Sequence, residues 1–218
     1  MTDHVPVALR SLWHELPLLA VTGVLTCTAY AAVVALMPGM TPSSVLLAAL
    51  VVSPVWAGVV ATTDSVVQGG PGGVLLLLRN LRRHWAAGLK VGLVAGAVAA
   101  LALVNWELYT ATGSSLLLVP LAVSGCSTVL AVLAAFCAFS LRVTAGLRGK
   151  PLWLTALAVV ARSPWVPLGV LSVVVVALLL GTSVTASLLL LAPGPVALFA
   201  SAGTWTVYRT ENLHALHR

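Results

Sequence analysis

Apolar residues form long runs along the chain, and most polar residues lie between these runs. A helix needs about 20 largely apolar residues to cross a bilayer, and six runs approach or reach that length. The six runs are Leu16–Leu36, Ser44–Thr63, Val91–Trp106, Ser115–Ser140, Val166–Leu180 and Leu188–Tyr208. The third and fifth runs are short and are expected to take a turn from their flanks. The pattern predicts an all-α polytopic membrane protein with six transmembrane helices.

The last run contains two prolines. Pro193 and Pro195 lie near its beginning. Proline inside a helix removes a backbone hydrogen bond and clashes with the preceding turn. A kink or a break is therefore expected in the sixth crossing.

The composition agrees with a membrane protein. Of 218 residues, 60% are hydrophobic and 7% are charged, and the mean hydropathy is +1.09. Soluble domains carry roughly 25% charged residues, so this chain cannot cover a surface that faces water. A soluble enzyme, a secreted disulfide scaffold and a disordered tail are excluded.

The basic residues predict the topology. With six crossings, all eleven lie on one side of the membrane. They are Arg10, Arg79, Arg82, Arg83, Lys90, Arg142, Arg148, Lys150, Arg162, Arg209 and Arg218. The three connections on the other side carry a single charge, that of Glu107. Basic residues accumulate on the cytoplasmic side, so both termini are predicted in the cytoplasm. Because the basic residues flank apolar runs, the pattern does not indicate a nucleic-acid surface.

Two short motifs recur and suggest three hairpin repeats within one domain of residues 1–218. An Arg precedes a Trp by three residues before each odd-numbered crossing, at Arg10 and Trp13, Arg82 and Trp85, and Arg162 and Trp165. A Ser leads into a Leu-rich run at Ser44, Ser115 and Ser187. The hairpins would comprise residues 10–63, 82–140 and 162–208. Anchoring at the membrane interface explains Arg and Trp at these places without a triplication, so both interpretations stay open.

The two long basic connections are each predicted to contain a helix. Val74–Lys90 has Leu78, Leu81, Trp85 and Leu89 on one face, with Arg79, Arg82, Arg83 and Lys90 beside it. The second connection predicts a helix over Leu152–Ala161. Both suit helices that lie in the inner interface and attract anionic lipid. A docking surface for a cytoplasmic partner is the alternative.

The crossings contain polar side chains but no charge near their middle. Asp64 and Glu107 fall at crossing ends, where we expect water to solvate them. Thr26 and Cys27 in the first crossing, with Ser124 and Ser127 in the fourth, would line a polar pathway if those helices meet. Such residues more often bond to their own helix. Small residues at Gly88, Gly92 and Gly96 predict close helix packing on the third crossing.

No catalytic, cofactor or metal site is predicted. Gly149-Lys150-Pro151 lacks the glycine and the hydroxyl residue of a phosphate-binding loop. Glu211, His214 and His217 have helical spacing for a metal, but a solvated tail is the expected state because only three ligands are present. The three cysteines lie inside apolar runs and are expected to be reduced. The chain is therefore predicted not to be an enzyme.

The region from residue 50 to residue 95 resembles the YesL-like family of bacterial membrane proteins, a domain of unknown function. The resemblance rests on Ser53-Pro-Val-Trp-Ala-Gly58, Gly69-Gly-Pro71 and Leu78-Arg-Asn-Leu-Arg-Arg-His-Trp85. The chain departs from the family in its Gln68-Gly-Gly-Pro loop and in the run of four leucines that follows. Members often accompany sugar-uptake systems of the ABC type, which implies an accessory role in carbohydrate transport. Some relatives are named reductases, but this chain has no flavin or dinucleotide motif.

These observations lead to two hypotheses. The first is a bacterial plasma-membrane protein that acts as an accessory or regulatory partner of a transport system. Its partners would be the anionic inner leaflet and components of an ABC-type sugar transporter, with no nucleic acid. The second is a small self-contained permease or channel with a pathway between the hairpins. The oligomeric state stays open.

Overall fold

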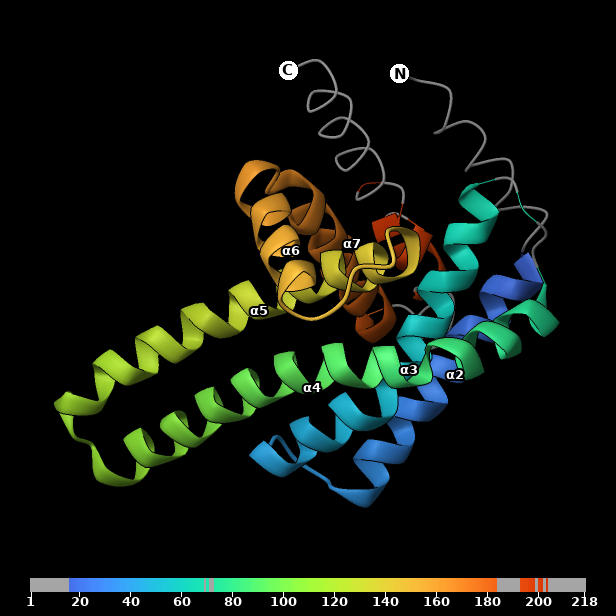
Figure 1. The fold of residues 1–218 in the computed structure, drawn as a ribbon. Helices are drawn as coiled ribbons and strands as arrows, with labels where there is room; N and C mark the ends of the chain where they lie inside the picture. Colours follow the sequence, from blue (N-terminus) through green and yellow to red (C-terminus); the bar gives the residue numbers. More distant parts are fainter. Residues whose placement is uncertain are drawn as a thin grey trace, which may run out of the picture.

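The structure, a computed structural model, describes residues 16–68, 70, 73–183, 193–198, 200, 201 and 203, and these contain helices and no strand. The helices are α2 (Leu16–Leu36), α3 (Pro42–Val67), α4 (Val74–Thr112), the 3-10 helix η1 (Ser115–Leu117), α5 (Leu118–Thr144), α6 (Lys150–Arg162) and α7 (Trp165–Ser183) (Figure 1). Residues 193–198, 200, 201 and 203 are also helical. The predicted all-α class is confirmed for the described part of the chain.

Three helical segments are long and apolar enough to cross a membrane. They are Pro42–Val66, Val74–Thr112 and Ser115–Val143. A fourth crossing is obtained if α6 and α7, which are bent by 81° relative to each other, count as one span. The first predicted crossing coincides with α2 and the fifth lies within α7. The sixth crossing falls largely outside the described residues, so six crossings and cytoplasmic termini stay predictions.

Helices α3 and α4 form an antiparallel pair with the most extensive packing in the structure. The small-residue stripe of α4 lies on α3. A Cβ at Gly88 would meet Ala57 and the backbone at Ser53 and Pro54, and one at Gly92 would meet Ser53. Small residues let two helix backbones approach in this way. The predicted packing role of the glycines is therefore confirmed.

Helix α4 is one continuous helix of 39 residues, about 58 Å long at 1.5 Å per residue. We call Val74–Lys90 its basic half and Val91–Thr112 its apolar half. The apolar half measures about 33 Å, close to the ~30 Å thickness of a bilayer core. A helix over Val74–Lys90 is confirmed, and it continues without a break into the third predicted crossing. Its position in the inner interface stays a prediction.

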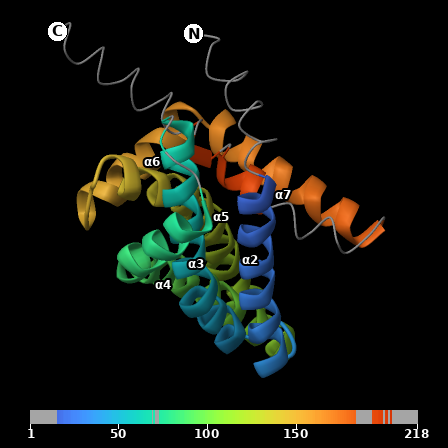
Figure 2. The same ribbon diagram turned by 90° about the vertical axis from the view of Figure 1, so that its right-hand side faces the viewer.

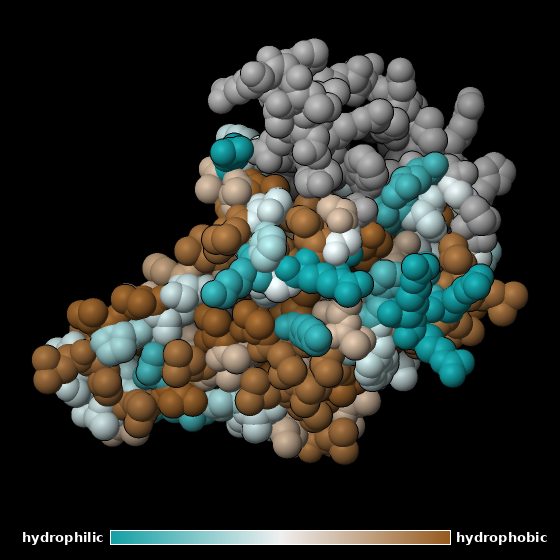
Figure 3. Space-filling model, viewed as in Figure 1, coloured by the Kyte–Doolittle hydropathy of each residue, from teal (hydrophilic) through white to brown (hydrophobic). Residues whose placement is uncertain are grey.

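Helix α5 returns along the apolar half of α4, and the two form a projecting hairpin (Figure 1). The chain turns at Gly113, which ends α4 with a left-handed φ of 63°. Glycine adopts this conformation without the steric cost that a Cβ adds. Figure 3 shows a mainly hydrophobic surface over this hairpin and hydrophilic residues gathered near the opposite end of α4.

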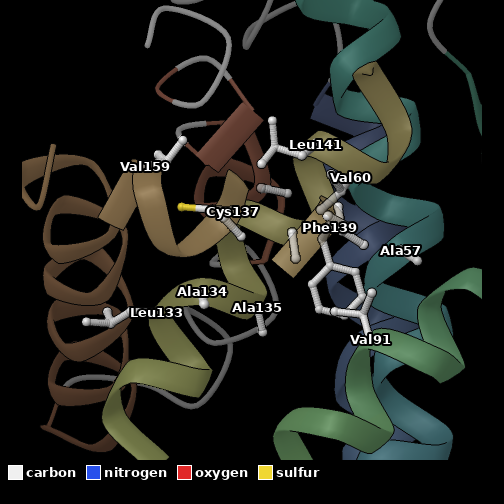
Figure 4. Packing of buried hydrophobic residues seen from close by; sticks show 14 of the residues in the cluster. Ala57, Val60, Val91, Leu133, Ala134, Ala135, Cys137, Phe139, Leu141 and Val159 are labelled. Atoms are coloured by element: carbon white, nitrogen blue, oxygen red, sulfur yellow. The ribbon is translucent and has the colours of Figure 1, made fainter. Parts of the chain in front are cut away.

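The core lies where the second half of α5 meets α3, α4 and α6. Phe139 of α5 lies next to Val60 of α3 and Val91 of α4 (Figure 4). Helix α6 adds Leu152, Ala156, Val159 and Val160, all buried and at helical spacing. The apolar face of α6 therefore packs within the protein, whereas the sequence left contact with lipid and docking of a partner as the two alternatives.

Helix α2 lies beside α3 (Figure 2) and packs mainly against it. The connection between them is short, and Thr41 begins α3. The Thr41 hydroxyl accepts a hydrogen bond from the backbone N–H of Ser44, and the Ser44 hydroxyl accepts one from the backbone N–H of Thr41. This capping box satisfies two backbone donors at the helix start. The first of the three repeated serines thus belongs to a capping box, as its third helical residue.

Candidate interaction surface on the basic half of helix α4

The basic half of α4 is held against the second half of α3. Leu77 is fully buried, and Leu81 lies on Gly58 of α3. The amide of Asn80 donates to the hydroxyl of Thr62 at 3.2 Å. The segment is thus a fixed part of the fold that presents only its remaining sides outward.

The outward sides carry the residues that the sequence singled out. Arg79, Arg82 and Arg83 are exposed, and Trp85 is 49% exposed. An open groove of about 420 Å³ is lined by Leu78, Leu81, Arg82 and Trp85. Residues 78, 82 and 85 are four and three positions apart and so share one side of the helix. The structure therefore brings two of the predicted contact residues, Arg82 and Trp85, together around an apolar depression.

The other Arg and Trp positions lie in different settings. Arg162 is the exposed last residue of α6, and Trp165 is the first residue of α7 and is 84% exposed. Arg82 and Trp85, in contrast, lie inside one continuous helix. Arg10 and Trp13 lie outside the described residues. The repeated motif thus occupies two different local structures, and in both the tryptophan reaches the surface.

A second basic group lies on the side of α4 that faces α5. The positive charges of Arg83 and Arg142 both act on His84, and that of Arg148 acts on Arg142. Burial and these two arginines lower the pKa of His84 from its ordinary value, because both disfavour the imidazolium. His84 precedes the apolar half of α4. This convergence of α4, α5 and the α5–α6 connection was not predicted.

The residues of the suggested polar pathway do not converge. Thr26 donates to the backbone carbonyl of Thr22 on its own helix, and Cys27 is partly exposed. Ser124 is buried and accepts from the amide of Asn105 on α4 at 3.0 Å. Ser127 is exposed. The buried polar side of α5 thus faces α4, while α2 packs mainly on α3.

Asp64 differs from the expectation that water solvates it. It is 4% exposed and accepts a hydrogen bond from the Gln68 amide at 2.8 Å. The adjacent Thr63 is also buried and lies 3.5 Å from Ser201 through their hydroxyls. Surrounding helices therefore cover this end of α3, which the sequence suggested was at the membrane edge. Glu107 is exposed, as expected.

Two asparagines were not singled out from the sequence, although each links helices. Asn80 bonds to α3 and Asn105 bonds to α5. Each is an amide within a helix otherwise rich in apolar residues. An amide that is partly withdrawn from water is stabilised by a hydrogen-bond partner, and this rule is the signal that could have identified both partly buried residues.

Comparisons with known proteins add no relative. No protein-family model matches the chain, and no curated protein or solved structure matches it.

Proposed function

We propose that this protein is a non-enzymatic membrane protein that acts as an accessory or regulatory partner of a transport system. The contact surface is the exposed side of the basic half of α4. The resemblance to the YesL-like family supports carbohydrate uptake as the process and a bacterial plasma membrane as the location. In this proposal both termini and the basic half of α4 face the cytoplasm.

The observation that carries the proposal is the groove beside Arg82 and Trp85. A half-exposed tryptophan and an arginine flank apolar side chains there. Tryptophan and arginine are enriched among the residues that dominate protein–protein binding. Because α4 is continuous, a partner bound at this groove is mechanically connected to a membrane helix. This arrangement suits a protein that holds or regulates a neighbouring transporter.

The clustered positive charges on this surface favour binding of a partner over exposure to water alone. Arg79, Arg82 and Arg83 follow one another within five residues. Like charges at close spacing repel one another. An acidic partner surface would relieve this repulsion and would also speed association.

Co-purification tests the proposal. The protein is extracted gently from its native membrane, crosslinked, and its partners are identified by mass spectrometry. The variant Arg79→Gln/Arg82→Gln/Arg83→Gln is expected to lose a transporter subunit that the unaltered protein retains. The matched control Arg148→Gln/Lys150→Gln/Arg162→Gln removes three charges from exposed positions elsewhere and is expected to retain it.

Two outcomes would contradict the proposal. Equal retention by the two variants would show that the basic half of α4 is not the contact. Recovery of the protein alone, together with solute flux through purified protein in liposomes, would favour a self-contained permease.

A further inference from the structure

The last turn of α5 presents Arg142 beside the basic half of α4. Leu141 is fully buried in the same core cluster as Leu77 and Val91 of α4. Arg142 follows at once, and its guanidinium donates to the carbonyls of Gly146 and Leu147 at 3.1 and 3.0 Å. These bonds hold the guanidinium over the α5–α6 connection. One nitrogen makes both bonds, and a guanidinium carries five N–H donors in all.

Several cationic groups meet at this junction. His84 lies midway between Leu77 and Val91 on the side of α4 that packs in the cluster with Leu141. The charges of Arg142 and Arg83 both act on His84, and Arg148, next to the Leu147 carbonyl that Arg142 binds, acts on Arg142. Arg83 and Arg148 are exposed, and His84 is partly buried. Groups of like charge raise one another's free energy. The junction is therefore a place where an anion would be stabilised.

The described part of the chain supplies little negative charge to this junction. Asp64 and Glu107 are its only carboxylates. Asp64 is buried on α3 with Gln68 as a partner. Glu107 is 17 residues beyond Lys90 on α4, about 25 Å along the helix. Neither offers a surface carboxylate at the junction.

The junction lies at the level where the apolar hairpin ends. Lys90 precedes the apolar half of α4, and Arg142 follows the apolar part of α5. The headgroup phosphates of the inner leaflet occupy this level in a protein of the predicted topology. Basic pockets between transmembrane helices on the cytoplasmic side are known to bind anionic headgroups.

We infer that the junction of α4, α5 and the α5–α6 connection binds the phosphate of an anionic phospholipid, with His84, Arg142 and Arg148 as the donors. The acyl chains would lie against the exposed apolar side of the α4–α5 hairpin. The inference does not depend on the proposed accessory role, because it uses the α5 side of α4 and not the groove at Arg82. Inorganic phosphate offers the same anionic group without acyl chains, so the experiment distinguishes inorganic phosphate from a phospholipid.

Native mass spectrometry of the whole protein in a neutral detergent tests the inference. Micelles carry no surface charge, so diffuse attraction to an anionic bilayer is removed. Phosphatidylglycerol is titrated against phosphatidylcholine, and one tightly bound phosphatidylglycerol is expected. Loss of one cation near an anionic surface weakens binding about fivefold. Arg148→Gln is therefore expected to weaken phosphatidylglycerol binding by about fivefold or more. His84→Ala is expected to weaken it as well, because it removes an N–H donor.

Arg79→Gln is the matched control, because Arg79 is an exposed cation of α4 outside the junction. It is expected to leave the affinity for phosphatidylglycerol unchanged. Equal losses in Arg79→Gln and Arg148→Gln would overturn the site, as would equal binding of the two lipids. Displacement of the lipid by an equal concentration of inorganic phosphate would overturn the lipid as the ligand. Arg142 is left intact because it also bonds to the carbonyls of Gly146 and Leu147 and so holds the α5–α6 connection.

Discussion

Gly58 of α3 and Leu81 of α4 pack so closely that a Cβ built on Gly58 would lie 2.8 Å from the Leu81 Cα. The nearest atom is backbone, so a rotamer change cannot relieve the contact. The contact lies between the polar bond of Asn80 with Thr62 and the glycine stripe. It fixes the separation of α3 and α4 on which the position of the basic half depends.

Gly58→Ala is expected to destabilise the protein, because the added methyl group forces the two backbones apart. Overpacking of this kind costs about 1–3 kcal/mol. Gly125→Ala is the control, since a Cβ at Gly125 meets nothing within 4 Å. Alanine is favoured over glycine in a helix by about 1 kcal/mol, so this variant is expected to be neutral or stabilising. Thermal unfolding in detergent compares them, and equal shifts would contradict the close contact.

The bond between Asn105 and Ser124 is expected to stabilise the α4–α5 hairpin. Interhelical hydrogen bonds in membrane proteins contribute about 0.6 kcal/mol on average and up to about 1.7. A double-mutant cycle with Asn105→Ala and Ser124→Ala measures the coupling free energy. Ser127 is exposed on the same helix, so a cycle of Asn105→Ala with Ser127→Ala should give no coupling. Coupling of equal size in both cycles would exclude a specific bond.

Acidification is expected to lower the free energy of unfolding, because it protonates His84. Its pKa is lowered in the folded protein, so the unfolded chain binds the proton more readily. This contribution to folding is present above the ordinary pKa of about 6.5 and is lost as pH falls toward the folded pKa. Thermal unfolding in lipid-free neutral detergent at pH 7.5 and pH 5.5 measures the change.

The variant His84→Gln distinguishes the contribution of His84 to the pH dependence from that of the other titrating groups. The variant is expected to lose less stability between the two pH values than the unaltered protein loses. Bound anionic lipid should also reduce the loss, since a phosphate stabilises the imidazolium. An identical pH dependence in variant and unaltered protein would show that His84 does not contribute.

The predicted topology requires the two ends of the α4–α5 hairpin to face opposite compartments. Ala111 is exposed near the Glu107 end, and Lys150 is exposed at the start of α6. In a cysteine-free background, a membrane-impermeant maleimide applied to intact cells should label Ala111→Cys. Lys150→Cys should react only after permeabilisation. The reverse result would invert the orientation drawn from the basic residues.

The interaction surface was only partly predictable from the sequence. The exposed Arg82 and Trp85 and the helix that carries them followed from amphipathic spacing. The junction at Arg142 did not, because it depends on α5 returning to the middle of α4, 58 residues after His84. The burial of Asp64 also escaped prediction, since its position at the end of an apolar run suggested contact with water.

Local hydrophobicity alone predicted the helical class that the described part of the chain shows, the helices long and apolar enough to cross a membrane, and the position of α2 at Leu16–Leu36. The bilayer acts on each segment separately through the cost of unsatisfied backbone groups, so segment length and composition suffice. Tertiary structure decided which faces meet: Gly58 on Leu81, Asn105 on Ser124, and α6 on α5. Several helix faces are apolar enough to pack, so their hydrophobic pattern does not choose among partners. Close approach at small residues and the hydrogen bonds of partly buried amides make that choice, and both depend on residues far apart in the chain.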